Sequence, residues 1–150
     1  MGEFELIRRF FSKDNNDTSV LIGVGDDGAI ISPSPGHDLV ISTDTLIENV
    51  HFPNCLPAED IGYRCVAVNV SDIAAMGARA RWMTLALTLP DVDEKWLQQF
   101  SDGLYYAAQK YDVSLIGGDT TSAQQISLTI SITGEVLPHQ AITRSHARRD

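Results

Sequence analysis

The amino-acid sequence predicts a single α+β domain, in which helices pack against a mixed or antiparallel sheet. The chain has 150 residues, the size of one ordinary globular domain, and 43% of them are hydrophobic, which is enough to fill one core. Stretches with helical periodicity alternate along the chain with short apolar stretches that are typical of strands. The sequence contains no tandem repeat or interdomain linker, so we expect one domain over residues 1–150.

Three stretches of the chain are predicted to be helical. Apolar residues recur on one side of the first stretch, over residues 3–11. Pro57 can open the second helix, and Gly77 can end it. Asp93 is a suitable N-cap for the third helix, whose apolar stripe begins at Trp96.

Apolar stretches bounded by turn residues predict the strands. They cover residues 20–31, 37–42, 81–89, 113–116 and 126–136. Glycines and two adjacent acids interrupt the first of them, so we expect an acidic turn there. The last alternates between apolar and polar side chains, which is typical of an antiparallel strand with one wet face. Because an unpaired edge of this kind is an aggregation hazard, we expect it to pair across a two-fold axis through Leu128 and its neighbours.

The net charge of the chain indicates which classes of binding partner to expect. Twenty acidic residues against eleven Lys and Arg give a formal net charge of −9, which disfavours nucleic acid and anionic membranes as partners and favours metal cations. Cys55 and Cys65 do not form a zinc-binding CxxC pair or a disulfide framework. The first eleven residues do not resemble a signal peptide, and no apolar run reaches membrane-spanning length, so we expect a cytoplasmic protein.

Four aspartates are candidates for binding a divalent cation, namely Asp27, Asp44, Asp72 and Asp119. All except Asp72 lie near the end of a predicted strand, beside small or hydroxyl residues such as Ser42 and Thr43. Magnesium prefers such oxygen ligands and often bridges carboxylates to substrate phosphates. Asp72 falls on the apolar stripe of the second helix, where a buried carboxylate needs a neutralising partner. Each Asp alone is more commonly a turn or cap residue, but the set favours a metal site.

Two other residues have an ordinary interpretation and a functional one. His51 lies beside Phe52, where a packed or capping imidazole is the ordinary role and a ligand contact is the alternative. Arg144 lies in a polar tail, where an exposed surface arginine is ordinary and a phosphate clamp is the alternative. The chain has no P-loop motif, so phosphate bound by this acidic protein must be accompanied by cations.

Four motifs are spread in order over most of the chain. They are Gly25-Asp26-Asp27-Gly28-Ala29, Ser42-Thr43-Asp44-Thr45-Leu46 with Val50-His51-Phe52, VNVSDIAAMGA over residues 68–78, and LIGGDTT over residues 115–121. Together they resemble the thiamine-monophosphate kinase family, in the superfamily of aminoimidazole ribonucleotide synthetase-like enzymes. The resemblance implies phosphorylation of thiamine monophosphate to thiamine diphosphate by direct transfer of a phosphoryl group, with ATP as co-substrate and several Mg²⁺ ions.

The resemblance also implies roles for individual residues. Positions that match magnesium ligands are Asp27, Ser42, Thr43, Asp44, Asp72 and Asp119. Positions that match nucleotide contacts are Gly118, Asp119 and Arg144, and His51 matches a substrate contact. None of these residues acts as a covalent nucleophile, so the implied reaction depends on positioning and on metal ions.

Members of the family begin with an α+β domain that binds ATP and magnesium and dimerises when sheets join into a barrel. A carboxyl-terminal domain follows it. The resemblance implies that residues 1–150 are the first of these domains, that the chain forms a homodimer, and that it can be inactive by itself. Two alternatives remain open. One is another ATP-using synthetase or kinase of the same superfamily, and the other is a non-catalytic module for dimerisation or metal binding.

Overall fold

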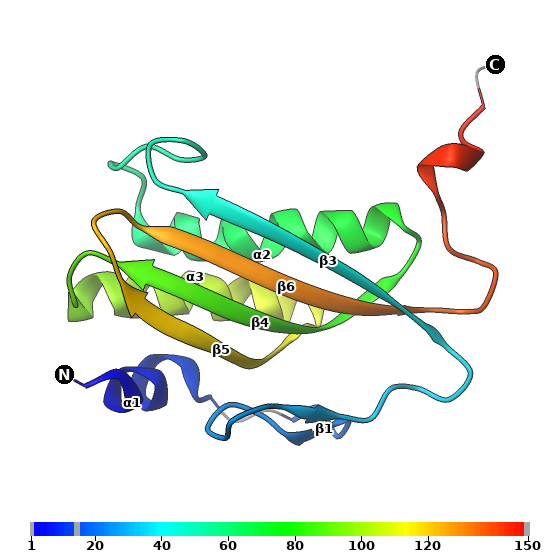
Figure 1. The fold of residues 1–150 in the computed structure, drawn as a ribbon, viewed down its shortest axis with the longest axis horizontal. Helices are drawn as coiled ribbons and strands as arrows, with labels where there is room; N and C mark the ends of the chain where they lie inside the picture. Colours follow the sequence, from blue (N-terminus) through cyan, green and yellow to red (C-terminus); the bar gives the residue numbers. More distant parts are fainter. Residues whose placement is uncertain (1, 14–15, 149–150) are drawn as a thin grey trace.

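In the computed structural model, two long helices cover one face of a four-stranded sheet (Figure 1). The structure describes residues 2–13 and 16–148. The elements in chain order are α1 (Glu3–Leu6), η1 (Ile7–Phe11), β1 (Val20–Ile22), β2 (Ile30–Ile31), β3 (Asp38–Ile47), α2 (Ala58–Ala75), β4 (Arg79–Leu89), α3 (Glu94–Tyr111), β5 (Ser114–Ser122), β6 (Ser127–Val136) and η2 (Arg144–His146). The predicted α+β class is confirmed.

The main sheet is mixed, with the strand order β3-β6-β4-β5. β6 runs antiparallel to both of its neighbours, and β4 and β5 are parallel to each other. The expectation that residues 126–136 form an edge was wrong, because β6 lies in the interior of the sheet. Leu128, which we expected at a dimer contact, is 1% exposed within the core of this chain. The outer strands of this sheet are β3 and β5.

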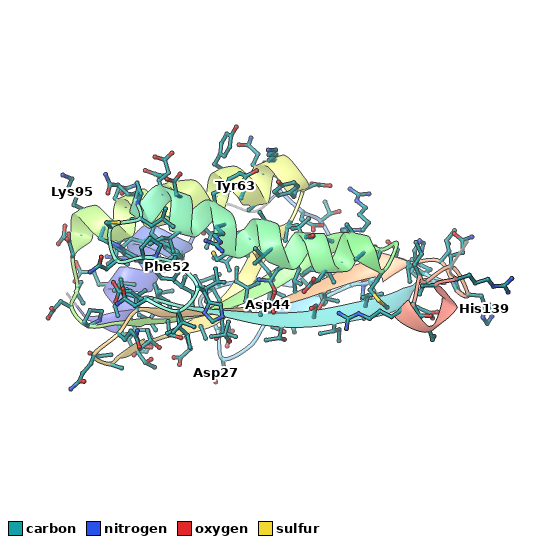
Figure 2. All side chains as sticks on the ribbon, turned by 90° about the horizontal axis from the view of Figure 1, so that it is seen from above. Asp27, Asp44, Phe52, Tyr63, Lys95 and His139 are labelled. Atoms are coloured by element: carbon teal, nitrogen blue, oxygen red, sulfur yellow. The ribbon has the colours of Figure 1, made fainter. Side chains whose placement is uncertain are left out.

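The two faces of the sheet differ in chemistry because successive side chains of a strand point to opposite sides. On β6, Leu128, Ile130 and Ile132 are almost fully buried, and Gly134, on the same side of this strand, packs against Ile73 of α2. The hydroxyl residues between them face the other side, where Thr129 bonds Thr45 at 2.9 Å and Ser131 accepts from Thr43 at 3.1 Å. α2 and α3 both lie on the opposite side of the sheet (Figure 2), so we call this hydroxyl-lined side the open face.

The two long helices form as the sequence predicts. The Asp93 carboxylate caps α3 by accepting hydrogen bonds from the backbone N–H groups of Lys95 and Trp96. α2 begins after Pro57 and ends at Ala75, before Gly77. The two helices pack closely, since a Cβ at Gly103 of α3 would overlap the backbone of Glu59 on α2.

The prediction that Asp72 faces the core was wrong. Asp72 is exposed, and its neighbour Ile73 is buried and packs against Gly134 of β6. Asn69, one turn earlier, is also buried. The buried stripe of α2 therefore passes beside Asp72, and the carboxylate needs no neutralising partner in the core.

The predicted strand boundaries also need correction. Residues 42–45 were expected at the end of a strand and residues 117–121 beyond one, yet both segments lie inside β3 and β5. The apolar and acidic stretch over residues 20–31 forms β1 and β2, which pair with each other around the predicted turn. The first helix is confirmed over residues 3–11, but its second half winds as a π-helix, and Phe4 is 86% exposed rather than packed.

The two cysteines of the described structure are not joined by a disulfide. Both are free thiols; Cys55 is exposed and Cys65 is buried. Burial raises the pKa of the Cys65 thiol to about 12, so this side chain acts as a small hydrophobic residue. Within the ranges that the structure describes, no helix is both long and apolar enough to cross a membrane.

We predict that Gly103→Ala destabilises the protein, because the added Cβ overlaps backbone atoms that cannot move aside. The free energy of unfolding should fall by about 1–3 kcal/mol or more. Urea unfolding measures this change, and Gly28→Ala is the control because its Cβ meets no atom within 4 Å. Equal unfolding midpoints for the two variants would contradict the close packing of α2 and α3.

Candidate functional site

The loop between β1 and β2 brings two aspartates to the β5 side of the sheet. A cavity of about 240 Å³ lies on the helix side of β5. Its lining combines residues 25–27 of the loop and residues 117–120 of β5 with the apolar side chains of Phe4, Ile7 and Leu85. Asp27 and Asp119 therefore lie at the border of the same cavity.

A second cavity, of about 410 Å³, lies on the open face. Its lining includes loop residues 26–29, residues 116–119 of β5, and Thr129 and Ser131 of β6. Asp27 and Asp119 line this cavity too, and Figure 2 shows Asp27 on the side of the sheet away from α2 and α3. The loop thus lies along the outer strand and reaches both sides of the sheet.

The local sequence explains the shape of this loop. Gly25 has a φ of 121°, a conformation that L side chains rarely adopt. At the next residue, the Asp26 carboxylate accepts a hydrogen bond from the backbone N–H of Asp27 at 2.8 Å. The Asp26 carboxylate therefore stabilises the turn, whereas the Asp27 side chain is exposed at the cavities.

Gly118 fixes the other half of this site. A side chain there would overlap the backbone of Leu85 on the neighbouring strand, so only glycine allows β4 and β5 to approach this closely. The next residue, Asp119, is aligned with Ala86 in β4, and Ala86 is aligned with Thr129 in β6. This register places Asp119 on the open face. The structure therefore brings Asp27, Gly118 and Asp119 to the same two cavities.

A second group of predicted residues lies on the outer strand β3 and on the adjacent part of α2. The Ser42 hydroxyl donates a long hydrogen bond of 3.4 Å to the carboxylate of Asp72 on α2. Asp44 is two residues further along β3, on the same face as Ser42. Thr43 points to the open face, where it contacts Ser131, which lines the larger cavity. The strand therefore divides the predicted set between its two faces.

These groups have the chemistry of a magnesium site that substrate completes. Among the described residues, no three Asp, Glu, His or Cys side chains are grouped closely enough to hold a metal by themselves. Magnesium commonly takes only one or two carboxylates from a protein and completes its shell with water and phosphate oxygens. The Asp27 and Asp119 pair, and the Ser42, Asp44 and Asp72 group, fit that role.

The other two predicted residues lie outside these cavities. His51 caps the turn after β3, because its Nδ1 accepts a hydrogen bond from the Ile47 N–H at 3.0 Å. This is the ordinary role that the sequence allowed, and the exposed imidazole remains a predicted substrate contact. Arg144 is exposed on η2 and lines neither cavity. Figure 1 draws η2 at the end of the sheet opposite to the arrowhead of β5.

The sequence analysis missed several residues around the site. Phe4 and Ile7 form part of the apolar wall of the smaller cavity, whereas their helical spacing predicted only one apolar side of the first helix. Thr129 and Ser131 line the larger cavity, and the alternation along residues 126–136 was the available signal for them. That pattern predicts a wet face but does not indicate which strand lies next to it.

The chain belongs to the family described as AIR synthase related protein, N-terminal domain, whose model matches residues 25–136. It is also similar to thiamine-monophosphate kinase from Escherichia coli (strain K12), with 48% identity over 148 residues, covering 98% of this chain. The chain spans 45% of that relative's length. The resemblance inferred from the four motifs is thus confirmed.

Two solved structures agree with this assignment. One is a thiamine-monophosphate kinase from Stenotrophomonas maltophilia K279a, with a TM-score of 0.81 and 46% identity, covering 86% of this chain and 40% of that one. The other is AaThiL complexed with AMPPCP and TMP, with a TM-score of 0.72 and 29% identity, covering 78% of this chain and 38% of that one.

We predict that Asp27→Asn and Asp119→Asn each weaken Mg²⁺ binding in the presence of ATP, because each substitution removes an anionic ligand. The loss should be at least about 10-fold in affinity, as measured by isothermal titration calorimetry. Asp91→Asn is the matched control, since Asp91 is exposed and lines neither cavity. Unchanged Mg²⁺ affinity in both site variants would rule out this pair as magnesium ligands.

Proposed function

We propose that this chain is the amino-terminal, ATP- and magnesium-binding part of an enzyme that phosphorylates thiamine monophosphate to thiamine diphosphate. The observation that carries this proposal is the meeting of Asp27, Gly118 and Asp119 at two shared cavities. The names of its relatives, and a related structure complexed with AMPPCP and TMP, support the choice of substrates.

In this proposal the carboxylates act by holding magnesium against phosphate oxygens. Phosphate placed directly beside Asp27 and Asp119 would be repelled, so a bound nucleotide requires cations there. When bound, Mg²⁺ neutralises the charge on the transferred phosphoryl group. Gly118 exposes backbone to the nucleotide. Arg144, with its exposed guanidinium, is proposed as a nucleotide-phosphate contact when the enzyme is complete.

The second group of predicted residues, on β3 and α2, is proposed to hold magnesium as well. Ser42, Asp44 and Asp72 offer hydroxyl and carboxylate oxygens for another magnesium ion, and Thr43 offers a hydroxyl on the open face. His51 is proposed to contact thiamine monophosphate from the turn that follows β3. Aligning two phosphorylated reactants between these groups supplies most of the catalysis that such a transfer needs.

No side chain is required as a nucleophile or as a strong base. The phosphate of the acceptor is itself the nucleophile, and its second ionisation has a pKa of about 6, so it is largely dianionic at neutral pH. Direct transfer from ATP therefore needs no covalent intermediate on this chain. The proposed site consists of metal ligands and includes no general base, which suits that reaction.

We also propose a homodimer in the cytoplasm, with a second domain that completes the site. Two features of β3 support the dimer: it is an outer strand of the described sheet, and its Leu39 and Ile41 side chains are 44% and 67% exposed. Pairing of such edges would build the expected barrel. The chain spans 45% of its relative's length, so the second domain would supply the remaining ligands.

We predict that a chimera of this chain with the remaining carboxyl-terminal part of the Escherichia coli relative converts ATP and thiamine monophosphate to ADP and thiamine diphosphate. Phosphorus NMR follows both products. Asp44→Asn in the chimera should lower turnover by at least about 100-fold, because a magnesium ligand is lost. The control is Asp60→Asn, an exposed residue in the first turn of α2.

Equal turnover in the Asp44→Asn chimera and its Asp60→Asn control would contradict the proposed site. A folded chimera that binds ATP without forming thiamine diphosphate would contradict the proposed substrate. The 150-residue chain alone, assayed in parallel, measures how much of the reaction the amino-terminal part supports.

A further inference from the structure

The segment that carries Asp27 is attached to the main sheet mainly at its two ends. We call residues 17–34 the acidic arm. Its strands β1 and β2 pair only with each other in the described structure and form a separate two-stranded sheet. Ladder hydrogen bonds therefore do not set the position of the arm, although Val24 packs against the core. Polar side chains at the start and at the end of the arm do this instead.

The start of the arm is held by β4. The Asp17 carboxylate accepts hydrogen bonds from the N–H and the hydroxyl of Ser19, at 2.9 and 2.6 Å, which closes a tight turn. The Ser19 hydroxyl in turn accepts from Trp82 Nε1 at 2.9 Å and from Arg81 Nη2 at 3.2 Å. Arg81 Nη2 also forms an ion pair with Asp17 at 3.5 Å. Two neighbouring side chains of β4 thus hold residues 17–19, and the Ser114 hydroxyl of β5 also donates to the Asp17 carboxylate at 3.3 Å.

The end of the arm is held by β6 through the same arginine. The Glu135 carboxylate accepts hydrogen bonds from the N–H and the hydroxyl of Ser34, at 2.6 and 3.0 Å. Its Oε2 also accepts from Arg81 Nη1 at 2.8 Å. The side chains of Arg81 and Glu135 are only 16% and 5% exposed, so water competes weakly for these contacts. One guanidinium therefore joins both ends of the arm.

We propose that Arg81 is a positioning residue, which holds Asp27 against Asp119 by bridging Asp17 and Glu135 at the two ends of the acidic arm. A planar guanidinium can serve both partners at once with separate N–H groups, whereas a lysine ammonium is a compact charge without this fork. The function of Asp27 as a magnesium ligand rests on the proposed function. The positioning of the arm does not.

The protonation of Glu135 agrees with this geometry. Burial raises the pKa of the carboxyl, but the hydrogen bonds from Ser34 and the positive charges of Arg81 and His37 outweigh it and lower the pKa below 4.5. Of the other charged side chains near Glu135, Asp17 shares Arg81, and Arg79 forms an ion pair with Asp112. Glu135 therefore stabilises the fold as a carboxylate.

We predict that Glu135→Gln lowers the urea midpoint at pH 7 and that its difference from the unsubstituted protein shrinks as the pH falls below 4.5. A depressed pKa in the folded state stabilises the protein above the ordinary pKa, and this contribution is lost as the pH falls through the folded value. Glu59→Gln, at an exposed position of α2, should show no such difference. A difference that stays constant from pH 7 to pH 3 would refute the ionic link.

Hydrogen–deuterium exchange of the protein without nucleotide tests the proposal. Arg81→Met should raise amide exchange over residues 20–34 by at least about 10-fold and leave α3 and β6 as protected as before. Arg79→Met is the matched control on the same strand, since the Arg79 side chain is 67% exposed and pairs with Asp112 instead of the arm. Arg81→Lys should give an intermediate exchange rate, because a lysine ammonium lacks the planar, forked guanidinium and can restore only part of the contacts with Asp17 and Glu135.

Three outcomes would overturn the proposal. In the first, the arm exchanges at the same rate in Arg81→Met as in Arg79→Met. In the second, exchange in Arg81→Met rises as much in α3 and β6 as in the arm. In the third, the arm of Arg81→Lys is as protected as that of the unsubstituted protein. If Arg81→Met does not fold, Ser34→Ala provides the same test at one end of the arm, and unchanged exchange of residues 30–34 would overturn the proposal. Mg²⁺ titration of Arg81→Met is separate: a loosened arm with unchanged Mg²⁺ affinity supports positioning and contradicts the role proposed for Asp27.

Discussion

The structure depends on one constraint, which is that α2 and α3 cover only one face of the main sheet. Because side chains alternate along each strand, every strand supplies one set of residues to the core and another to the open face. On β6 this separates buried Leu128 and Ile130 from the half-buried hydroxyls of the open face. On β3 the same alternation sends Ser42 toward α2 and Thr43 toward the open face.

The candidate site arises where this sheet meets a segment that does not belong to it. The acidic arm runs beside the outer strand β5, and its loop reaches both faces, so Asp27 approaches Asp119 from outside the sheet. Gly118 allows the strand to lie close to β4, and Arg81 ties the arm to β4 and β6. In our proposal, side-chain hydrogen bonds and ion pairs, rather than backbone pairing with the main sheet, bring the two aspartates to the same cavities.

The sequence predicted the elements with strong periodicity and missed those that depend on distant contacts. The helix after Pro57 and the helix capped by Asp93 were confirmed, because their stripes and caps are local. Residues 42–45 and 117–121 were not recognised as strand interior, because polar and glycine residues indicate a loop unless neighbouring strands pair with them. The order of the strands was not predictable either, since periodicity carries no information about pairing partners. The four motifs identified candidate residues, but not the separation of Ser42 from Thr43.

The central claim is that the acidic arm and β5 together hold metal and phosphate. The most direct measurement is a crystal structure of the protein grown with Mn²⁺ and a non-hydrolysable ATP analogue, with anomalous difference maps to locate the metal. The account predicts a manganese peak bridging the carboxylates of Asp27 and Asp119 to phosphate oxygens, with the arm in the position described above. Bound nucleotide with no metal at this pair, or with Asp27 turned away from Asp119, would contradict it.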